Sequence, residues 1–465
     1  MGAWTQFPPP PESALRFRPD AIWISHEHSD HFHEPTLRLY DRSTPIYLPA
    51  FANGRLEERC YALGFTDVHV LPFGEQRRVH ERVAITCFEP GSLWNDASAL
   101  IEVDDFKILN INDAGLNPRL RERTGAVDIV CSAFGVGASG YPLTWSHIDD
   151  GQKKQIIETN RLGMFEMLRE AVRLYGPRYV LPFAGHFALW HPSHREFMIA
   201  LEPTHVSDVV RALSDTGVTV LDLLPGDSFT PARGEVTRLT SAGSADTATC
   251  AALEYCREHF DEAEFRSHHP EDSDVTSGEL ADYLLKLNTV PEILFCEDMT
   301  IRVALTDDAH SEERVIVFAR VEAGCLMVSG DDPGSSDVSI NVPSGVMARL
   351  IRDQESWDEA HIGYWCRFTR SPDVYHANFW RLLQAPRFNA IASRRDPSGS
   401  VTGDSIIAEV LERLGDSADR VIRRRGMYCV GCNRSPTETL AEGARNHGLT
   451  DDDLEHVLGE LNALV

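Results

Sequence analysis

The sequence lacks long hydrophobic runs, abundant cysteine and any secretory leader. No run of about 18 apolar residues occurs among its 465 residues, so we expect no transmembrane helix and no membrane partner. The first residues, MGAWTQFPPPPESALRF, have no basic segment followed by an apolar core, so we expect a cytoplasmic protein. Ten irregularly spaced cysteines in a chain this long do not predict a disulfide framework.

Positive charge is also scarce, because 44 Lys and Arg stand against 71 Asp and Glu, for a net charge of −27. Nucleic-acid binding needs a basic footprint on the phosphate backbone, so no nucleic-acid partner is expected. Most of this acidity is attributed to solubility. The charge still allows one small anionic substrate, held by a local group of Arg and Lys.

The length predicts more than one domain, and the first 235 residues predict a layered α/β domain. Helical patterns cover 149–175, which ends at Gly176-Pro177, and 203–216. Short apolar segments bounded by Pro, Gly or Asp predict strands. These segments are 21–25, 45–48, 67–72, 83–88, 98–103, 106–111, 127–132 and 178–183.

Two further parts are expected after this first domain (1–235). Residues 234–250 have the composition of a linker or long loop, and residues 250–390 predict an α+β domain. The last part, 404–465, predicts a small all-α module. Within 250–390 we expect strands at 301–305, 314–320 and 325–328, and helices at 276–287 and 343–353.

Histidines and acids crowd directly behind the first predicted strand, in AIWISHEHSDHFHEP (21–35). Residues two apart in an extended segment point to the same side, so His26 and His28 can converge on one ion. After a turn, Asp30 and His31 can face a neighbouring site. Imidazole and carboxylate without thiolate suit zinc, iron or manganese and argue against a purely structural zinc site. A histidine-rich surface loop without metal is the alternative.

Further candidate ligands follow later predicted strands. Asp113 stands at the end of KILNINDAG, His186 stands in YVLPFAGHF, and Glu89 and Asp96 stand in FEPGSLWNDASALIEV. Each also has an ordinary structural interpretation. Asp113 can form a turn, His186 can be a half-buried hydrogen-bonded histidine, and Asp96 can cap the next strand.

Together these motifs resemble the metallo-β-lactamase fold, an αββα sandwich with metal ligands on loops at one sheet edge. The resemblance implies one or two metal ions, with Asp30 and Asp113 as candidate catalytic carboxylates. The implied ligands are His26 and His28 for one metal, Asp30, His31 and His186 for the second, and Asp113 as the bridge.

The third ligand of the first site is usually histidine in that fold, and residues 85–98 contain none. Glu89 or Asp96 would have to replace it. A carboxylate in place of imidazole makes the site harder, which favours iron, with zinc or manganese as alternatives.

Four long motifs are similar to CMP-N-acetylneuraminate hydroxylase and its bacterial relatives. They occur in that family's order and cover most of residues 20–385. The resemblance implies oxygen-dependent hydroxylation of a polar, nucleotide-sugar-like small molecule, with electrons from a Rieske [2Fe–2S] domain. The motifs are ALIEVDDFKILNINDAG, SAFGVGASGYPLTW, YVLPFAGHFALWHPSH and WDEAHIGYWCRFTRSPDVYHANFW.

The Rieske part has no counterpart in this sequence. Such a cluster needs two cysteines and two histidines, and no Cys-x-His occurs in the chain. Only about twenty residues, four of them consecutive prolines, precede the first predicted strand. We therefore expect an N-terminally truncated sandwich, with the true start upstream or with a separate electron-transfer protein as the [2Fe–2S] donor.

Two other motifs stay open between a functional and a structural interpretation. The glycines of FGVGASGYPLTW (134–145) either bind an anionic group on backbone N–H donors or form a tight turn. Cys429 and Cys432 belong to a Cys-x-x-Cys helical module that resembles those beside hybrid-cluster and redox proteins. Such a pair is a redox or metal-binding candidate, or else a structural pair.

Three functions compete. The first is a metal-dependent monooxygenase, with iron favoured. The second is a dimetal zinc hydrolase of an ester, amide or phosphodiester, in which metal lowers the pKa of a bound water. The third is a scaffold whose Cys-x-x-Cys module docks on a redox partner. The acidic third ligand favours the hydroxylase, and the missing Rieske part favours the hydrolase.

Overall fold

The computed structural model divides the chain into two compact units. The first consists of Met1–Ala50, Leu56–His268 and Ile362–Tyr364, and the second of Phe51–Arg55, His269–His361 and Trp365–Val465. The division into three domains stays a prediction. The structure describes residues 3–51, 54–89, 96–117, 120–137, 139–184, 187–239, 249–268, 275–352, 355–389, 399–427 and 438–464.

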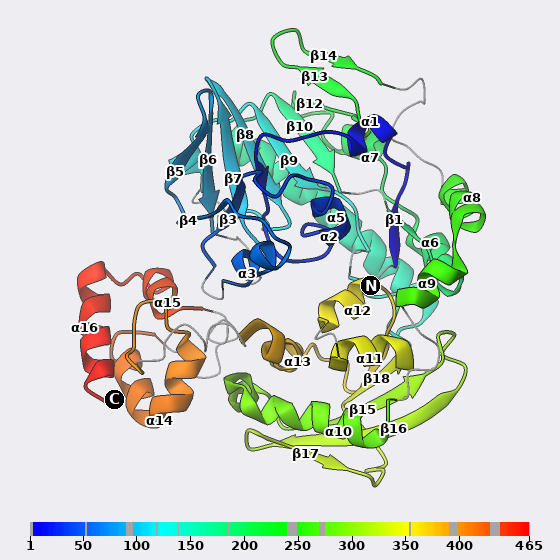
Figure 1. Cartoon of the computed structure of the whole chain (residues 1–465), viewed down its shortest axis with the longest axis vertical. Coiled ribbons are helices and arrows are strands. Elements are labelled where there is room, and N and C mark those ends of the chain that lie inside the picture. Colours follow the sequence, from blue (N-terminus) through cyan, green and yellow to red (C-terminus); the bar gives the residue numbers. More distant parts are fainter. Residues whose placement is uncertain are drawn as a thin grey trace. The chain divides into compact units, whose positions relative to one another are not determined.

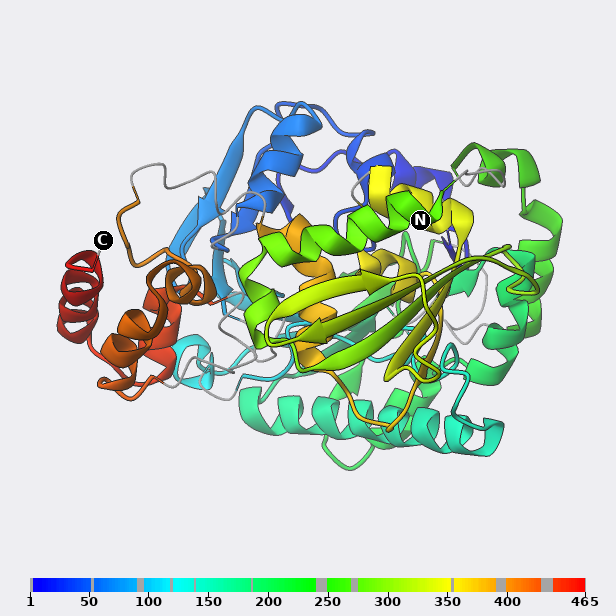
Figure 2. The ribbon, with the colours of Figure 1, turned by 90° about the horizontal axis from the view of Figure 1, so that it is seen from below.

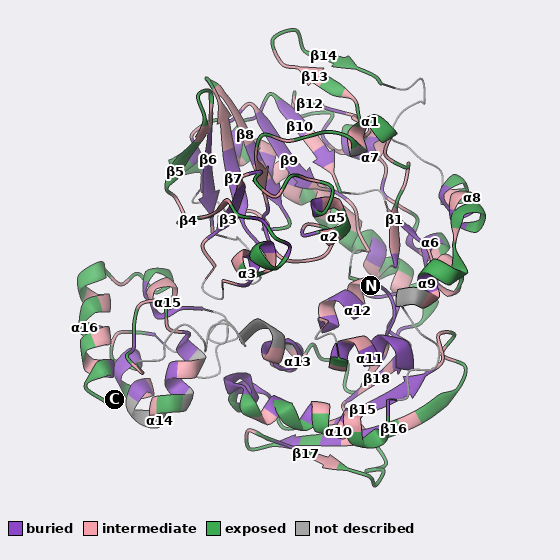
Figure 3. Cartoon of the chain, viewed as in Figure 1, coloured by how far each residue is buried: buried purple, intermediate pink, exposed green. Residues whose placement is uncertain are grey.

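A seven-stranded sheet forms the centre of the first unit (Figure 1). Its first four strands run parallel and its last four alternate in direction, with β8 common to both parts. Strand β5 is polar and mostly exposed at the edge, whereas β9 is largely buried and β8 is partly to fully buried along its length (Figure 3). The order is β12 (Thr219–Val220), β10 (Tyr179–Phe183), β9 (Ile129–Ala133), β8 (Phe106–Asn112), β7 (Ser98–Val103), β6 (Val83–Phe88) and β5 (Gln76–His80).

A smaller parallel sheet, β2 (Ile22–Trp23), β3 (Ile46–Pro49) and β4 (Val68–Leu71), packs on the large one. Tyr47 and Leu71 of the small sheet share a hydrophobic cluster with Ile85 and Cys87 of β6. Neighbouring parallel strands need crossover connections, which here contain α2 (Glu34–Leu37) and α3 (Arg55–Ala62). Because the inner face contacts the large sheet, these helices cover the outer face.

The other face of the large sheet is covered by α5 (Asp150–Tyr175) and α7 (Val206–Ala212), and Figure 2 shows α5 along its length. Asp149 and Gln152 form a capping box at the start of α5, and Gly176 ends it in the left-handed conformation. The helix predicted over 149–175 is therefore confirmed, and α7 is shorter than the predicted 203–216. The layers follow the αββα order that the resemblance implied.

All eight strands predicted in the first 235 residues are confirmed, but several other elements were missed. The segment predicted as a linker begins with β14 (Glu235–Thr237), which forms a hairpin with β13 (Ser228–Thr230). Strand β1 (Trp4–Gln6) pairs with β11 (Phe187–Leu189). The remaining elements of this unit are α1 (Glu12–Leu15), α4 (Leu120–Thr124), the 3-10 helix η1 (Pro192–His194), α6 (Arg195–Leu201), α8 (Thr249–His259) and α9 (Glu262–His268).

The second unit contains a five-stranded sheet with α10 beside it (Figure 2). The three strands and two helices predicted here are confirmed, whereas β18 and β19 were missed. The sheet order is β17 (Cys325–Ser329), β16 (Glu313–Glu322), β15 (Met299–Thr306), β18 (Val338–Pro343) and β19 (Arg367–Arg370). The helices are α10 (Ser277–Leu285), η2 (Lys286–Thr289), η3 (Pro291–Phe295), α11 (Ser344–Arg352), α12 (Trp357–Ile362) and α13 (Ala377–Asn389).

The predicted C-terminal helices are present as α14 (Ile407–Arg423), α15 (Leu440–Asn446) and α16 (Asp451–Asn462). They enclose a hydrophobic cluster that includes Ile407 and Leu440, and Phe295 of η3 packs into the same cluster. Cys429 and Cys432 lie outside the described residues. No helix in the described part of the chain combines the length and hydrophobicity needed to span a lipid bilayer.

Candidate metal centre

The histidine-rich loop leaves β2 and folds back in one tight turn. The backbone N–H of Ile24 donates to the carbonyl of Tyr47 at 3.1 Å, which extends the pairing with β3 up to the motif. The carbonyl of His28 then accepts hydrogen bonds from the N–H groups of His31 at 2.9 Å and Phe32 at 2.7 Å. This turn brings the ring of His31 to 4.0 Å from that of His26, measured between centroids.

One group of three candidate ligands consists of His26, His28 and Asp96. The Nε2 atom of His26 lies 3.0 Å from Nδ1 of His28 and 3.5 Å from a carboxylate oxygen of Asp96. His26 and Asp96 are buried, at 2% and 6% exposure. The N–H of Ala97 donates to the carbonyl of Ser25 at 3.4 Å, which joins the segment that carries Asp96 to the loop. Buried imidazole and carboxylate of this kind suit a divalent metal ion.

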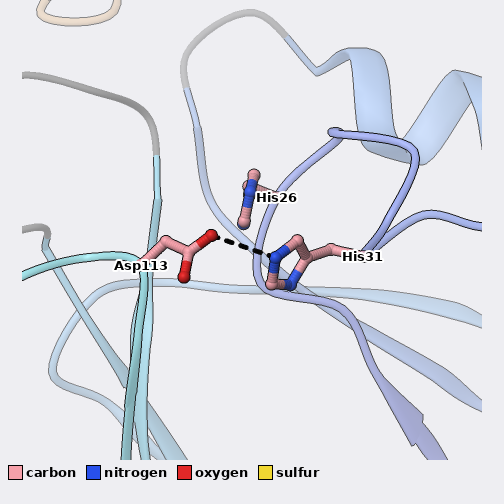
Figure 4. Close-up of side chains that lie close together, drawn as sticks. All are labelled: His26, His31 and Asp113. Carbon is pink, nitrogen blue, oxygen red and sulfur yellow. Dashed lines mark hydrogen bonds and ion pairs between the residues drawn. The ribbon is translucent and has the colours of Figure 1, made fainter. Parts of the chain in front are cut away.

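A second group consists of His26, His31 and Asp113 (Figure 4). The Nε2 atom of His31 lies 3.1 Å from a carboxylate oxygen of Asp113, which follows β8 directly. Asn112, the last residue of β8, has a left-handed backbone with φ of 56°. Because β8, β9 and β10 run parallel, the segments that follow them lie at one edge of the sheet.

The imidazole rings of His26 and His31 differ in charge. Burial, with the nearby charges of His31 and His28, lowers the pKa of His26 well below 6.5. Burial also disfavours protonation of His31, but hydrogen bonds to Asp113 and Asp30 outweigh it and raise its pKa to about 9. Before a metal binds, His31 therefore carries the positive charge between the carboxylates and would have to give up its Nε2 proton to become a ligand. Neutral His26 already keeps a lone pair for a ligand.

Asp30 and Glu89 stand apart from these two groups. A carboxylate oxygen of Asp30 lies 3.4 Å from Nε2 of His31. Burial disfavours its ionised form, but the hydrogen bond with His31 and the nearby histidine charges lower the pKa of Asp30. Glu89 lies 3.9 Å from a guanidinium nitrogen of Arg123, and neither three-residue group found among the described residues includes it. His186 lies outside the described residues.

Two residues that support the loop were missed at the sequence level. The hydroxyl of Ser25, at 3% exposure, lies 3.0 Å from Nδ1 of His26 and 3.4 Å from Nδ1 of His31. Arg59 of α3 donates to the carbonyl of Glu27 at 2.9 Å. Ser25 directly precedes the motif, so its position was a usable signal, whereas nothing in the sequence connects Arg59 to the loop.

The glycine-rich segment after β9 is held by packing. Gly137 has φ of +98°, and a Cβ at this position would lie 2.5 Å from a methyl carbon of Leu201. The hydroxyl of Tyr364 donates to the carbonyl of Gly137. Trp145 is 2% exposed, which favours core packing for this side chain. These contacts favour the tight turn over an anion cradle at Gly137.

Comparison with known proteins identifies several relatives that this chain matches over two thirds or more of their own length. The chain is similar to CMP-N-acetylneuraminate hydroxylases over most of its length. It is 26% identical over 427 residues to cytidine monophosphate-N-acetylneuraminic acid hydroxylase of Mus musculus, covering 82% of this chain and 68% of the mouse protein. The Danio rerio protein is 25% identical over 433 residues, covering 87% of this chain and 71% of its own. The inactive cytidine monophosphate-N-acetylneuraminic acid hydroxylase of Homo sapiens is 27% identical over 406 residues, covering 82% of this chain and 78% of the human protein.

Solved structures give weaker likenesses. A possible metal-dependent hydrolase from Veillonella parvula superposes with a TM-score of 0.30 at 12% identity, covering 47% of this chain and 76% of that one. The metallo-β-lactamase fold protein YhfI from Bacillus subtilis superposes with a TM-score of 0.26 at 12% identity, covering 44% of this chain and 75% of that one. No protein-family model matches the sequence.

Proposed function

We propose that the protein is a metal-dependent hydroxylase, with iron as the metal, acting on a polar, nucleotide-sugar-like small molecule. The observation that carries the proposal is the convergence of imidazole and carboxylate groups behind β2 and β8, in a chain similar to hydroxylases over 82% of its length. The proposed ligands are His26, His28, His31, Asp96 and Asp113, with Asp30 beside them and His186 retained from the sequence.

The donor set supports iron over a structural zinc site. No cysteine belongs to either three-residue group among the described residues. Histidine with carboxylate is a donor set used by non-haem iron oxygenases, and it leaves room for oxygen and substrate when few protein groups bind the metal. Bound iron would supply a place for oxygen to bind and be reduced. Asp96 is the proposed third ligand beside His26 and His28, in preference to Glu89.

The chain's own residues would orient and charge the site. The Ser25 hydroxyl lies beside the Nδ1 atoms of His26 and His31, and both Nε2 atoms face carboxylates. With metal on the Nε2 atoms, the hydroxyl would accept a hydrogen bond from each Nδ1–H. Asp30 and Asp113 flank His31 on the exposed side of the cluster. His26 and Asp96 form the buried side, from which water is largely excluded.

The proposed reaction needs an external electron source. Hydroxylation inserts one oxygen atom of O2 into a substrate C–H bond, and the other oxygen atom leaves as water after taking up two electrons and two protons. The proposed donor is a separate protein with a [2Fe–2S] cluster of the Rieske type. Each reduced cluster carries one electron, so each turnover would use two reduced clusters.

The decisive experiment measures metal content and oxygen use together. Protein purified without added metal is analysed for iron, zinc and manganese, then supplied with O2, a reduced [2Fe–2S] protein and cytidine monophosphate-N-acetylneuraminic acid. We expect bound iron, substrate-dependent oxygen uptake and a product heavier by one oxygen atom that comes from O2. A double change, His28→Ala with Asp113→Ala, should remove both metal and turnover. Unchanged metal content in this variant would refute the proposed centre.

A zinc hydrolase is the second candidate, supported by the presence of two ligand groups that share His26. Two neighbouring metals can activate a water molecule for attack on an ester, amide or phosphodiester. Bound zinc, together with turnover of a chromogenic ester and no oxygen uptake, would favour this candidate and exclude the hydroxylase.

A further inference from the structure

The guanidinium group of Arg59 contacts both halves of the histidine-rich loop. One of its nitrogens donates to the carbonyl of Glu27 at 2.9 Å, and Glu27 stands between His26 and His28. The guanidinium carbon lies 4.2 Å from the ring centre of Phe32, which follows His31 directly and is fully buried. A second nitrogen of the guanidinium lies 3.3 Å from a carboxylate oxygen of Glu34.

These contacts differ in what they contribute. The ion pair with Glu34 is partly exposed, with 23% exposure for Arg59 and 41% for Glu34, so it adds little stability. The hydrogen bond to Glu27 fixes the peptide between the first two candidate ligands. The cation–π contact holds the ring of Phe32, whose N–H closes the turn at His28. A planar guanidinium can make all three contacts at once, which an ammonium group cannot.

We propose that Arg59 is a positioning residue for the metal centre, which it reaches only through the loop backbone and Phe32. Holding Glu27 and Phe32 against α3 keeps His28 and His31 turned toward His26 before any metal binds. A preorganised ligand set binds metal more tightly because less conformational entropy is lost on binding. This inference rests on the metal centre of the proposed function.

Arg42 provides a matched control within the same part of the fold. Its guanidinium carbon lies 4.9 Å from the ring centre of buried Phe65. It donates to the carbonyls of Leu37 at 2.9 Å and Tyr40 at 3.3 Å, at the end of α2. Arg42 therefore makes the same kinds of contact to a segment that carries none of the proposed ligands.

The test compares Arg59→Met, Arg59→Lys and Arg42→Met in the full-length protein, with Co²⁺ as the probe. Affinity is measured by competition with a chromophoric chelator, geometry by the visible absorption of bound Co²⁺, and stability by urea unfolding. We expect Arg59→Met to weaken Co²⁺ binding by about tenfold or more and to change the absorption spectrum. Arg59→Lys should recover part of the affinity. Arg42→Met should lower stability and leave both Co²⁺ readouts unchanged.

The outcomes separate this inference from the proposed function. Wild-type protein that shows no Co²⁺ absorption would overturn the proposed centre, and the role of Arg59 with it. Wild-type binding that stays the same in both Arg59 variants would overturn the role of Arg59 alone. Equal losses of Co²⁺ affinity in Arg59→Met and Arg42→Met would assign Arg59 to general stability and also overturn its role. If Arg59→Met does not fold, Arg59→Lys against wild type decides, with an unchanged Co²⁺ spectrum as the contrary result.

Discussion

The hydroxyl of Ser25 lies 3.0 Å from Nδ1 of His26, while Nε2 of the same ring faces Asp96 at 3.5 Å. The same hydroxyl lies 3.4 Å from Nδ1 of His31, whose Nε2 faces Asp113 at 3.1 Å. An imidazole that gives its Nε2 lone pair to a metal carries its proton on Nδ1. A hydroxyl oxygen has two lone pairs, so one serine can accept both protons and set the orientation of both rings.

Replacing Ser25 by Ala should therefore weaken metal binding through two rings at once. We expect a loss of about tenfold in Co²⁺ affinity, because the orienting acceptor of both histidines disappears. Chelator competition measures the affinity. Ser43→Ala is the control, since the Ser43 hydroxyl bonds to Asp41 on the surface. Equal affinity in Ser25→Ala and Ser43→Ala would contradict the role of Ser25.

Asp96 and Glu89 can be separated by isosteric amide substitution. Asp96→Asn removes the charge beside His26, so we expect bound metal to fall to at most half of the wild-type content. Glu89→Gln should leave the metal content unchanged, because Glu89 pairs with Arg123 at 3.9 Å. Metal analysis after exhaustive dialysis gives the answer. The reverse order of losses would show that Glu89 is the ligand.

Two glycine-to-alanine substitutions should change the free energy of unfolding in opposite directions. In Gly137→Ala the new Cβ would lie 2.5 Å from the nearest methyl carbon of Leu201, which is a steric clash. The φ of +98° is also unfavourable for alanine. We expect unfolding free energy to fall by about 2 kcal/mol or more. Gly163→Ala, within α5 with open space around it, should raise it by about 0.5–1 kcal/mol. Urea unfolding measures both, and a neutral Gly137→Ala would show that the loop can shift.

Stability at mild acidity should depend on His361 of the second unit. Its ring lies 4.9 Å from that of Phe368 and 6.0 Å from that of Trp380, and burial lowers its pKa to about 4. Between pH 4 and about 6.5 the unfolded chain binds the proton and the folded chain does not. The stability associated with neutral His361 is therefore fully present above pH 6.5. Below that pH the free energy of unfolding falls, by at most about 1.4 kcal/mol per pH unit.

His361→Phe keeps an aromatic ring and removes the titration. We expect its unfolding free energy to fall less steeply than that of wild type between pH 6.5 and 4. Urea unfolding at several pH values gives both curves. Parallel curves for the two proteins would contradict the low pKa of His361.

The local patterns that predicted correctly were those in which burial dictates residue type. Apolar segments such as 83–88 and 98–103 became β6 and β7 because both faces of these strands are covered. Strand β5 was missed because its QRRVH sequence lies mostly exposed at a sheet edge, with only Val79 packed against the hydrophobic cluster beneath. Strand β14 was missed for the same reason, since all three of its residues are exposed.

Among the candidate ligands, too, local sequence was informative for some residues and not for others. The spacing within the loop was enough to propose His26, His28, Asp30 and His31 as candidate ligands, because side-chain direction in an extended segment follows from position. The choice between Glu89 and Asp96 was not available from spacing, since both follow the same strand. The described contacts bring Asp96 to the buried ring of His26 and Glu89 to Arg123.

The sequence by itself determined the strands, the long helix α5 and the chemical character of the loop behind β2, because each depends on neighbours along the chain. Only the tertiary structure decided that Asp113 faces His31, that Ser25 lies between two imidazoles and that Arg59 holds the loop. The first and third of these relationships depend on parallel strand pairing and on the crossover through α3, which join residues far apart in the sequence. The second depends on the turn at His28, which folds the loop back in a way that strand periodicity cannot predict.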